Sequence, residues 1–179
     1  MPGLSLYINA FMPDHPVHIR RAVGESDASS AASIMAATDP WKRLGRRYDD
    51  TFRIVTEPGA EVFVAVTADE EVEGLVLIRM MPVFKGYIQA IAVHESARNQ
   101  GIGTMLLEFA EERIFRESPN VFLCCSSFNH DAMRLYHRLG YQRIGEIKDF
   151  VIAGAGEILM RKTIGPMATF QSTAGTKPR

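Results

Sequence analysis

The sequence predicts an α/β protein in which a mixed, mostly antiparallel sheet of about seven strands packs against four helices. The first observation behind this class is the order of patterns: strand, two helices, three strands, helix, strand, helix, two strands. The second is a hairpin, because an acidic turn joins the β-branched runs Glu61–Thr67 and Val72–Met80. The third is a strand, glycine turn and helix in the middle of the chain. At 179 residues and 46% hydrophobic, the chain has the size of one domain with one core.

The elements before the hairpin have local signals. A strand of alternating polarity is expected at Val17–Val23. A helix of small residues follows at Asp27–Ala37, with Ser26 as its cap, and a second helix runs from Asp39 through Trp41. Asp39-Pro40 is a favourable N-cap and N1 pair. An apolar stripe formed by Tyr48, Phe52 and Val55 then leads to the turn at Pro58-Gly59.

The second half of the chain reads as two strand–helix units followed by a hairpin. The expected strands are Lys85–His94, Val121–Ser126, Gln142–Ile152 and Glu157–Thr163. One helix follows the first of these strands and runs to Arg116, and another is expected at His130–Leu139. Asn129 or Ser127 can cap the second helix, and Gly140 can end it.

Composition limits the domain organisation and the class of protein. We expect an N-terminal arm over 1–16, with Leu4–Ala10 as a short strand, the folded domain over 17–165, and a flexible tail over 166–179. A net charge of −1 gives no reason to expect nucleic-acid or membrane-surface binding. Adjacent Cys124 and Cys125 lie in a strand, which favours a reduced, cytoplasmic protein, and no Cys/His cluster has the spacing of a metal site.

The stretch from Ile88 to Leu107 has the pattern of a phosphate-binding turn. A buried strand ends at Val93, the chain tightens onto Gly101 and Gly103, and helical spacing of apolar residues follows. Glycines allow close approach of a ligand, and the first turn of a helix offers unpaired N–H groups and partial positive charge. Arg98 adds a full positive charge beside this turn.

Two families use such a turn. A dinucleotide-binding turn requires a third glycine or an alanine where this chain has Leu106, so NAD binding is a weak alternative. The run Arg98 to Gly103 instead resembles the Q/R-x-x-G-x-G/A signature of the GNAT superfamily of acetyl-CoA-dependent N-acyltransferases. The resemblance implies acetyl-CoA as cofactor, with its pyrophosphate on a loop of cofactor-binding residues: Arg98, Asn99, Gln100, Gly101, Gly103 and Thr104.

The resemblance implies further site residues. In the family two central parallel strands splay apart, and the pantetheine arm pairs with backbone that corresponds here to Ile91, Ala92 and Val93. The segment from Asn129 to Tyr141 is similar to the family's Asn-x-x-A-x-x-x-Y-x-x-x-G-F/Y element. Asn129 would contact the cofactor amide, and Tyr136 would be the catalytic proton donor at the thioester sulfur. A phenol with pKa ~10 is a reasonable donor to a thiolate whose thiol has pKa ~8.5.

The acceptor end of the site carries less information. Family members often place a histidine or glutamate where this chain has Tyr87 and Gln89, and neither of these is a competent base. They could order water for a carboxylate, with three candidates: Glu57, Glu61 and Asp149. Trp41 and the last hairpin would line the acceptor pocket.

These residues together predict an N-acetyltransferase that moves an acetyl group from acetyl-CoA directly to a primary amine of a small molecule or peptide. The alternative is a non-catalytic acyl-CoA-binding or regulatory domain that kept the cofactor motifs. The acceptor, the general base and dimerisation through the last strands or the arm are left open.

Overall fold

A computed structural model describes residues 16–173, and these form one seven-stranded sheet with four α-helices. The strands are β1 (His18–Arg21), β2 (Ala60–Val66), β3 (Val72–Arg79), β4 (Tyr87–Val93), β5 (Asn120–Ser126), β6 (Gln142–Lys148) and β7 (Gly156–Thr163). The helices are α1 (Gly24–Ala37), α2 (Tyr48–Thr56), α3 (Ile102–Phe115) and α4 (His130–Arg138), with short 3₁₀ turns at Glu95–Ala97 and Met167–Thr169. The strand order is β1-β2-β3-β4-β5-β7-β6, and only β4 and β5 pair in parallel. The predicted fold class is confirmed.

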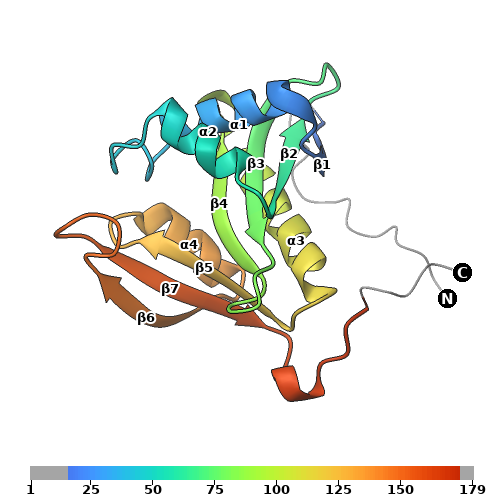
Figure 1. Cartoon of the computed structure of the whole chain (residues 1–179), viewed down its shortest axis with the longest axis vertical. Helices are drawn as coiled ribbons and strands as arrows, with labels where there is room; N and C mark the ends of the chain where they lie inside the picture. The colour runs from blue at the N-terminus through green and yellow to red at the C-terminus, as the bar shows by residue number, and fades with distance from the viewer. Residues whose placement is uncertain (1–15, 174–179) are drawn as a thin grey trace, which may run out of the picture.

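The helices cover the two faces of the sheet and form two cores. In Figure 1, α1 and α2 lie over one face of β2, β3 and β4, and α3 lies behind the same strands. Buried alanines of α1 pack with Met35 against Val64 and Leu75 on the first face. On the other face, Leu106 and Ile114 of α3 and residues of α4 pack against the remaining apolar side chains of the sheet. The sheet is therefore the middle layer of a sandwich.

The sheet divides into two halves between β4 and β5. The ladder between these strands consists of Tyr87 opposite Phe122 and Ile88 opposite Leu123, whereas β3 and β4 pair along almost their whole length. Figure 1 shows β4 and β5 running in different directions beyond this point. Gln89 is the extra residue of a bulge at the same place, because Leu77 pairs with Ala90 while Ile78 pairs with Ile88. A bulge bends its strand and increases the local twist, so β4 turns away from β5 here.

Two glycines allow α3 to lie directly on the sheet. A Cβ atom on Gly74 would lie 3.0 Å from the Ala92 carbonyl oxygen and 3.0 Å from a methyl of Leu106. A Cβ atom on Gly86, which has φ +90°, would lie 2.3 Å from a methyl of Ile114 in α3 and 2.6 Å from the Asn120 carbonyl oxygen. Only glycine fits at such contacts. They fix the position of α3 and therefore of the glycine turn that precedes it.

Several element boundaries differ from those expected. The second helix begins at Tyr48, and residues 38–47 form isolated turns, because Gly45 adopts φ +70° and interrupts any helix from Pro40. α1 begins at Gly24 instead of after Ser26, since the Asp27 carboxylate accepts a hydrogen bond from the Val23 N–H at 2.7 Å. β6 ends at Lys148, before the expected Ile152, where Asp149 takes φ +54°.

The ends of the domain are described in part. The predicted strand Leu4–Ala10 lies outside the described residues. Near the other end, Ser172 and Thr173 donate hydrogen bonds to the Arg116 carbonyl oxygen, so the chain as far as residue 173 packs beside the end of α3. None of the helices between residues 16 and 173 has both the length and the apolar character needed to cross a membrane.

Candidate active site

A cavity of about 360 Å³ lies between the two halves of the sheet. Its walls include every residue of β4 and the β5 residues from Leu123 to Ser126. Because the ladder ends at Ile88 and Leu123, the facing backbone edges beyond this point have no strand partner within residues 16–173. An unpaired edge can hydrogen-bond an extended ligand through N–H and C=O groups. The residues predicted to pair with the pantetheine arm lie on this wall: Ile91, Ala92 and Val93.

The glycine turn lines a second cavity of about 800 Å³ that adjoins the first. The two cavities share Arg98, Gly103 and Asn129 as lining residues, and Asn99, Gly101 and Thr104 line the second alone. Gly101 has φ +82°, and no atom lies within 4 Å of the place where a Cβ atom would be. The turn is therefore open to a ligand. Of the predicted loop residues, only the Gln100 side chain turns away, donating to the Ser96 carbonyl oxygen at 3.2 Å.

The charges at this turn suit an anion. The N–H groups of residues 102–104, in the first turn of α3, have no carbonyl one helical turn before them, whereas Met105 already donates to Gly101 at 3.0 Å. Arg98 is exposed and contacts only the Thr38 hydroxyl, at 3.5 Å, and it takes part in none of the ion pairs found between residues 16 and 173. An open glycine turn, a helix N-terminus and an unpaired guanidinium fit the diphosphate of a coenzyme.

Asn129 and α4 form the wall next to the glycine turn. The Asn129 side-chain oxygen accepts from the Ala132 N–H at 3.2 Å and so caps α4, as the sequence predicted. Since this oxygen is occupied, the two amide N–H donors of Asn129 are the groups left for a ligand carbonyl. One residue thus ends the loop and presents donors to both cavities.

Tyr136 lines the first cavity from α4 and is 7% exposed. Its ring lies 5.7 Å from that of Tyr141, at an interplanar angle of 59°. Burial raises the pKa of the Tyr136 hydroxyl, and the nearby Cys125 raises it further. A hydroxyl with a raised pKa keeps its proton at neutral pH, which is the state that a proton donor requires.

The predicted acceptor residues Trp41, Tyr87 and Gln89 line the same cavity as Tyr136. Phe150 of the β6–β7 loop joins them. Burial and the neighbouring Cys124 raise the pKa of Tyr87, so this phenol is not a base at neutral pH. The predicted residues of the acceptor end and the cofactor end therefore meet in one space.

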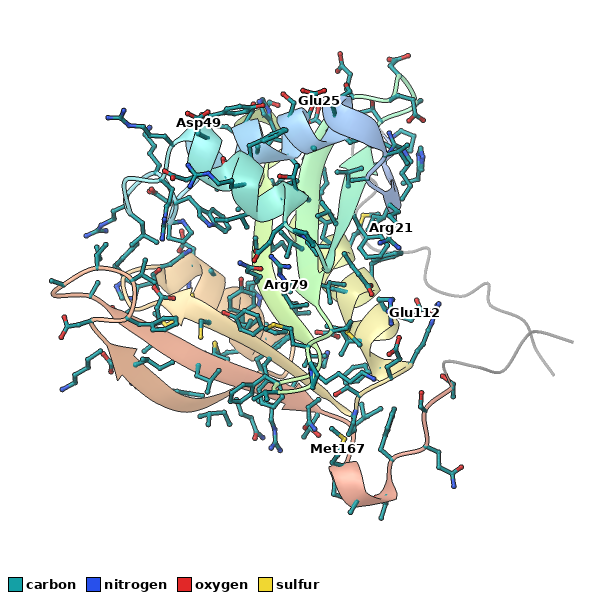
Figure 2. The ribbon with its side chains drawn as sticks, in the orientation of Figure 1. Arg21, Glu25, Asp49, Arg79, Glu112 and Met167 are labelled. Atoms are coloured by element: carbon teal, nitrogen blue, oxygen red, sulfur yellow. The ribbon has the colours of Figure 1, made fainter. Side chains whose placement is uncertain are left out.

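Gln89 is held by a residue that the sequence did not single out. Arg79 is 6% exposed, and its Nε atom donates to Gln89 Oε1 at 2.6 Å. The same guanidinium forms an ion pair with Glu57 and donates to the Pro58 carbonyl oxygen at 3.2 Å. Figure 2 shows Arg79 near the centre of the molecule, at the lower end of β3. Because a guanidinium has only donors, the Gln89 oxygen faces Arg79 and the amide nitrogen is the branch left for the cavity.

The structure places none of the three carboxylates proposed as base on the cavity wall. Glu61 accepts two hydrogen bonds from Arg113 of α3, at 2.7 and 2.8 Å. Asp149 accepts from the Gly154 N–H at 2.6 Å and closes the β6–β7 loop. Glu57 reaches the site only through Arg79. Each of the three is paired with another group of the chain, and the expectation that one of them supplies the base through ordered water stays a prediction.

A different carboxylate, Glu157, lies on the cavity wall at the start of β7. It is 7% exposed, and its Oε1 atom accepts a hydrogen bond from the Ser126 hydroxyl at 2.6 Å. The sequence held one signal for it, since an acidic residue directly before the apolar run Ile158–Met160 needs a partner or a function. The position of Glu157 before an apolar run does not tell which strand the carboxylate would face.

Comparisons with known proteins identify the family of the chain. Residues 29–141 match the model of the acetyltransferase (GNAT) family. An N-alpha-acetyltransferase of Saccharolobus solfataricus is 28% identical over 121 residues, which are 60% of this chain and 72% of that protein. A ribosomal-protein-alanine N-acetyltransferase from Escherichia coli is 17% identical and superposes with a TM-score of 0.68, covering 84% of this chain and 95% of that one.

An aminoglycoside 6′-N-acetyltransferase complexed with coenzyme A is 18% identical, with a TM-score of 0.66 over 83% of this chain and 98% of that chain. At such identities the two solved structures show a shared fold and no more. The family match covers more than half of the sequence and includes the glycine turn and α4 through Tyr136. The comparisons give no support to a non-catalytic acyl-CoA-binding domain. The chain therefore belongs to the GNAT family, and it is an acetyltransferase that uses acetyl-CoA.

Proposed function

We propose that this enzyme transfers an acetyl group from acetyl-CoA directly to a primary amine, and that the amine is the α-amino group of a peptide. The observation that carries the proposal is the separation of β4 from β5 after Ile88 and Leu123. It creates a cavity that reaches from the glycine turn at one end to Trp41 and Gln89 at the other. A cofactor and an acceptor can thus approach each other between the strands.

Each part of the chain has a separate task in this proposal. The N–H groups from Asn99 to Thr104 and the Arg98 guanidinium hold the diphosphate, and the free edge of β4 pairs with the pantetheine amides. When bound, acetyl-CoA supplies an acyl carbonyl carbon and a thiolate leaving group. The Tyr136 hydroxyl, kept protonated by burial, donates its hydrogen to the sulfur position as negative charge develops there.

The choice of a peptide α-amine rests on acid–base chemistry and on the cavity. An α-amino group with pKa ~7.8 is partly neutral at pH 7, whereas a lysine side chain with pKa ~10.4 is almost wholly protonated. The Gln89 amide can donate to the carbonyl next to an α-amine, and Trp41 and Phe150 offer apolar contacts to the first side chain. The similarity to an N-alpha-acetyltransferase supports the same choice.

The test is acetyl transfer by the wild-type enzyme and by Tyr136→Phe. We expect thiol release from acetyl-CoA with short peptides, and a kcat about 100-fold lower in Tyr136→Phe because one donor to the developing charge is lost. The Kd for coenzyme A should be unchanged, since the phenol contacts coenzyme A only at the sulfur position and acts there as charge develops. Calorimetry with coenzyme A and a coupled thiol assay measure the two quantities.

Tyr48→Phe is the matched control, because the Tyr48 hydroxyl contacts Ser29 at 3.0 Å and lies outside both cavities. It should keep full activity. Equal kcat values for wild type and Tyr136→Phe would remove Tyr136 from the mechanism. Turnover with lysine side chains or small amines but not with peptide N-termini would overturn the choice of acceptor.

A further inference from the structure

We infer that Glu157 is the general base of this enzyme: it binds the substrate ammonium at the cavity wall and removes the proton that prevents the amine from attacking. The inference rests on the proposed acetyl transfer and assigns the group that the sequence left open. It places the base on β7, across the cavity from the β4 positions where the resemblance pointed.

The position of Glu157 is fixed by the sheet. Glu157 lies opposite Ser126 in the β5–β7 ladder, at the end of β5 where the cavity opens. The Ser126 hydroxyl donates to Oε1 at 2.6 Å and holds the carboxylate in one orientation. Carboxylate oxygens accept hydrogen bonds at several positions, so the second oxygen remains able to accept one from an ammonium.

No basic side chain of residues 16–173 forms an ion pair with this carboxylate, and the two cations that line the same cavity are Arg46 and Arg98. The other acidic side chains buried in this part of the chain have basic partners: Asp27 pairs with Arg20 and Glu111 with Lys162. Glu157 takes part in no ion pair among the described residues and has only a hydroxyl as partner. A carboxylate that is nine-tenths buried and lacks a cation is costly, and a cationic substrate removes that cost.

The groups around Glu157 do not compete for the proton. Tyr87 of β4 and Cys124 and Cys125 of β5 lie near it, and burial raises the pKa of all three, so they stay protonated and neutral. Tyr136, from α4, is also neutral.

On β6, Ile147 lies opposite Glu157. The charged neighbours of Ile147 along this strand are Glu146, which pairs with Arg143 at 2.9 Å, and Lys148, which is exposed. Burial also raises the pKa of the Glu157 carboxyl itself, which brings it closer to that of an α-amine. Among the acid–base groups named on this wall, Glu157 is thus the carboxylate, and its raised pKa makes it a better acceptor for the proton of an ammonium.

The ammonium R–NH₃⁺ gives one proton to the Glu157 carboxylate, which leaves R–NH₂ and a neutral carboxyl. The amine nitrogen forms a bond to the acetyl carbon, the C–S bond breaks, and nitrogen loses its second proton. One of the two protons ends on the thiol through Tyr136, and the other is released to water when Glu157 ionises again. No oxidant or further reactant is needed.

The experiment compares kcat/KM over pH for the wild type and for Glu157→Gln, whose amide oxygen can still accept from Ser126. At pH 7 we expect a loss of about 100-fold. The wild-type value should fall on the acid side as Glu157 takes up its proton. Glu157→Gln can use only amine that is already neutral, and the neutral fraction rises about tenfold for each pH unit up to the amine pKa of ~7.8. The loss of kcat/KM relative to the wild type should therefore shrink by the same factor.

A second measurement does not depend on turnover. In the enzyme without ligands and with ¹³C-labelled glutamate, one carboxyl resonance should titrate above the ordinary glutamate range, and it should be missing from Glu157→Gln. The Kd for coenzyme A should be the same in both proteins. Glu146→Gln is the matched control, because this glutamate lies on the adjacent strand, pairs with exposed Arg143 and lines neither cavity. It should keep the wild-type pH profile.

Three results would overturn the assignment: a deficit that does not change with pH, full activity in Glu157→Gln, or a Glu157 carboxyl that titrates in the ordinary range. If the variant fails to fold, the titration of the wild-type carboxyl and the profile of Glu157→Asp decide the matter. A wild-type enzyme inactive on every amine would instead refute the proposed function, while the titration would still report on Glu157.

Discussion

At the scale of single residues, Arg79 determines which group Gln89 presents to the acceptor. A glutamine can turn either its oxygen or its nitrogen toward a cavity, and the two choices favour opposite substrates. With Oε1 held by Arg79 at 2.6 Å, the donor side faces the cavity. The site then suits an acceptor with a carbonyl or carboxylate oxygen close to its amine. Arg79 acts through Gln89 and is a positioning residue.

Gln89→Met should raise the KM for a peptide acceptor about tenfold and leave kcat nearly unchanged, because one hydrogen bond to the bound peptide is lost in ground state and transition state alike. The variant also leaves the buried Arg79 Nε without an acceptor, which should lower the free energy of unfolding by roughly 1–3 kcal/mol. Steady-state kinetics and urea denaturation measure the two effects. Glu57→Gln, at the exposed end of the same group of side chains, keeps an acceptor for Arg79 and should leave the KM unchanged. A fall in kcat at constant KM would speak against this role of Gln89.

At the scale of elements, the turn between β4 and α3 combines a conformational need with a functional one. Gly101 precedes α3 with φ +82°, in the left-handed region that side chains rarely adopt, and no atom fills the space beside it. Several exposed glycine turns of the chain share this openness, Gly59 among them. What distinguishes the turn at Gly101 is that it also lines a cavity and precedes the free N–H groups of a helix.

Gly101→Ala should raise the Kd for coenzyme A at least tenfold, because the methyl group enters the space beside the diphosphate and strains the turn. Gly59→Ala is its matched control, since Gly59 has φ +81°, has no atom within 4 Å of its Cβ position, and lies outside both cavities. Both variants should lose about 1–2 kcal/mol of unfolding free energy from backbone strain. Calorimetry with coenzyme A separates them, and equal Kd values would show that the turn does not contact the cofactor.

At the scale of the whole molecule, the site is a division of the sheet. β1 to β4 with α1, α2 and α3 form one half, β5, β7 and β6 with α4 form the other, and they share a two-residue ladder and the core around α3. Such a division leaves backbone groups without partners. A ligand between the strands would therefore complete the hydrogen bonding of the sheet and join its halves.

Coenzyme A should consequently stabilise the entire domain. At 100 times its Kd it adds about 2.7 kcal/mol, which corresponds to a rise in Tm of roughly 5–10 °C for a chain of this length. Differential scanning calorimetry measures the shift. NAD⁺ at the same concentration should leave Tm unchanged, because the position of a third glycine is held by Leu106. A shift with NAD⁺ and none with coenzyme A would contradict the family assignment of the turn.

The sequence by itself determined what depends on neighbours along the chain. The order of strands and helices, the glycine turn before α3, the Asn129 cap and the placement of Tyr136 on α4 all follow from periodicity, caps and motif spacing. These features are local, since each is decided by hydrogen bonds and packing within a few residues. The resemblance then placed the cofactor residues, and most of them do line the two cavities.

Only the tertiary structure decided where the sheet divides and which acidic side chain enters the division. The bulge at Gln89 depends on its pairing with β3, and the position of Glu157 depends on the register of β7 against β5, about thirty residues earlier in the chain. Arg79 reaches Gln89 and Glu57 only because three segments meet. Strand register and buried charge pairing are settled by the whole set of contacts in the core, and no pattern within a single segment carries that information.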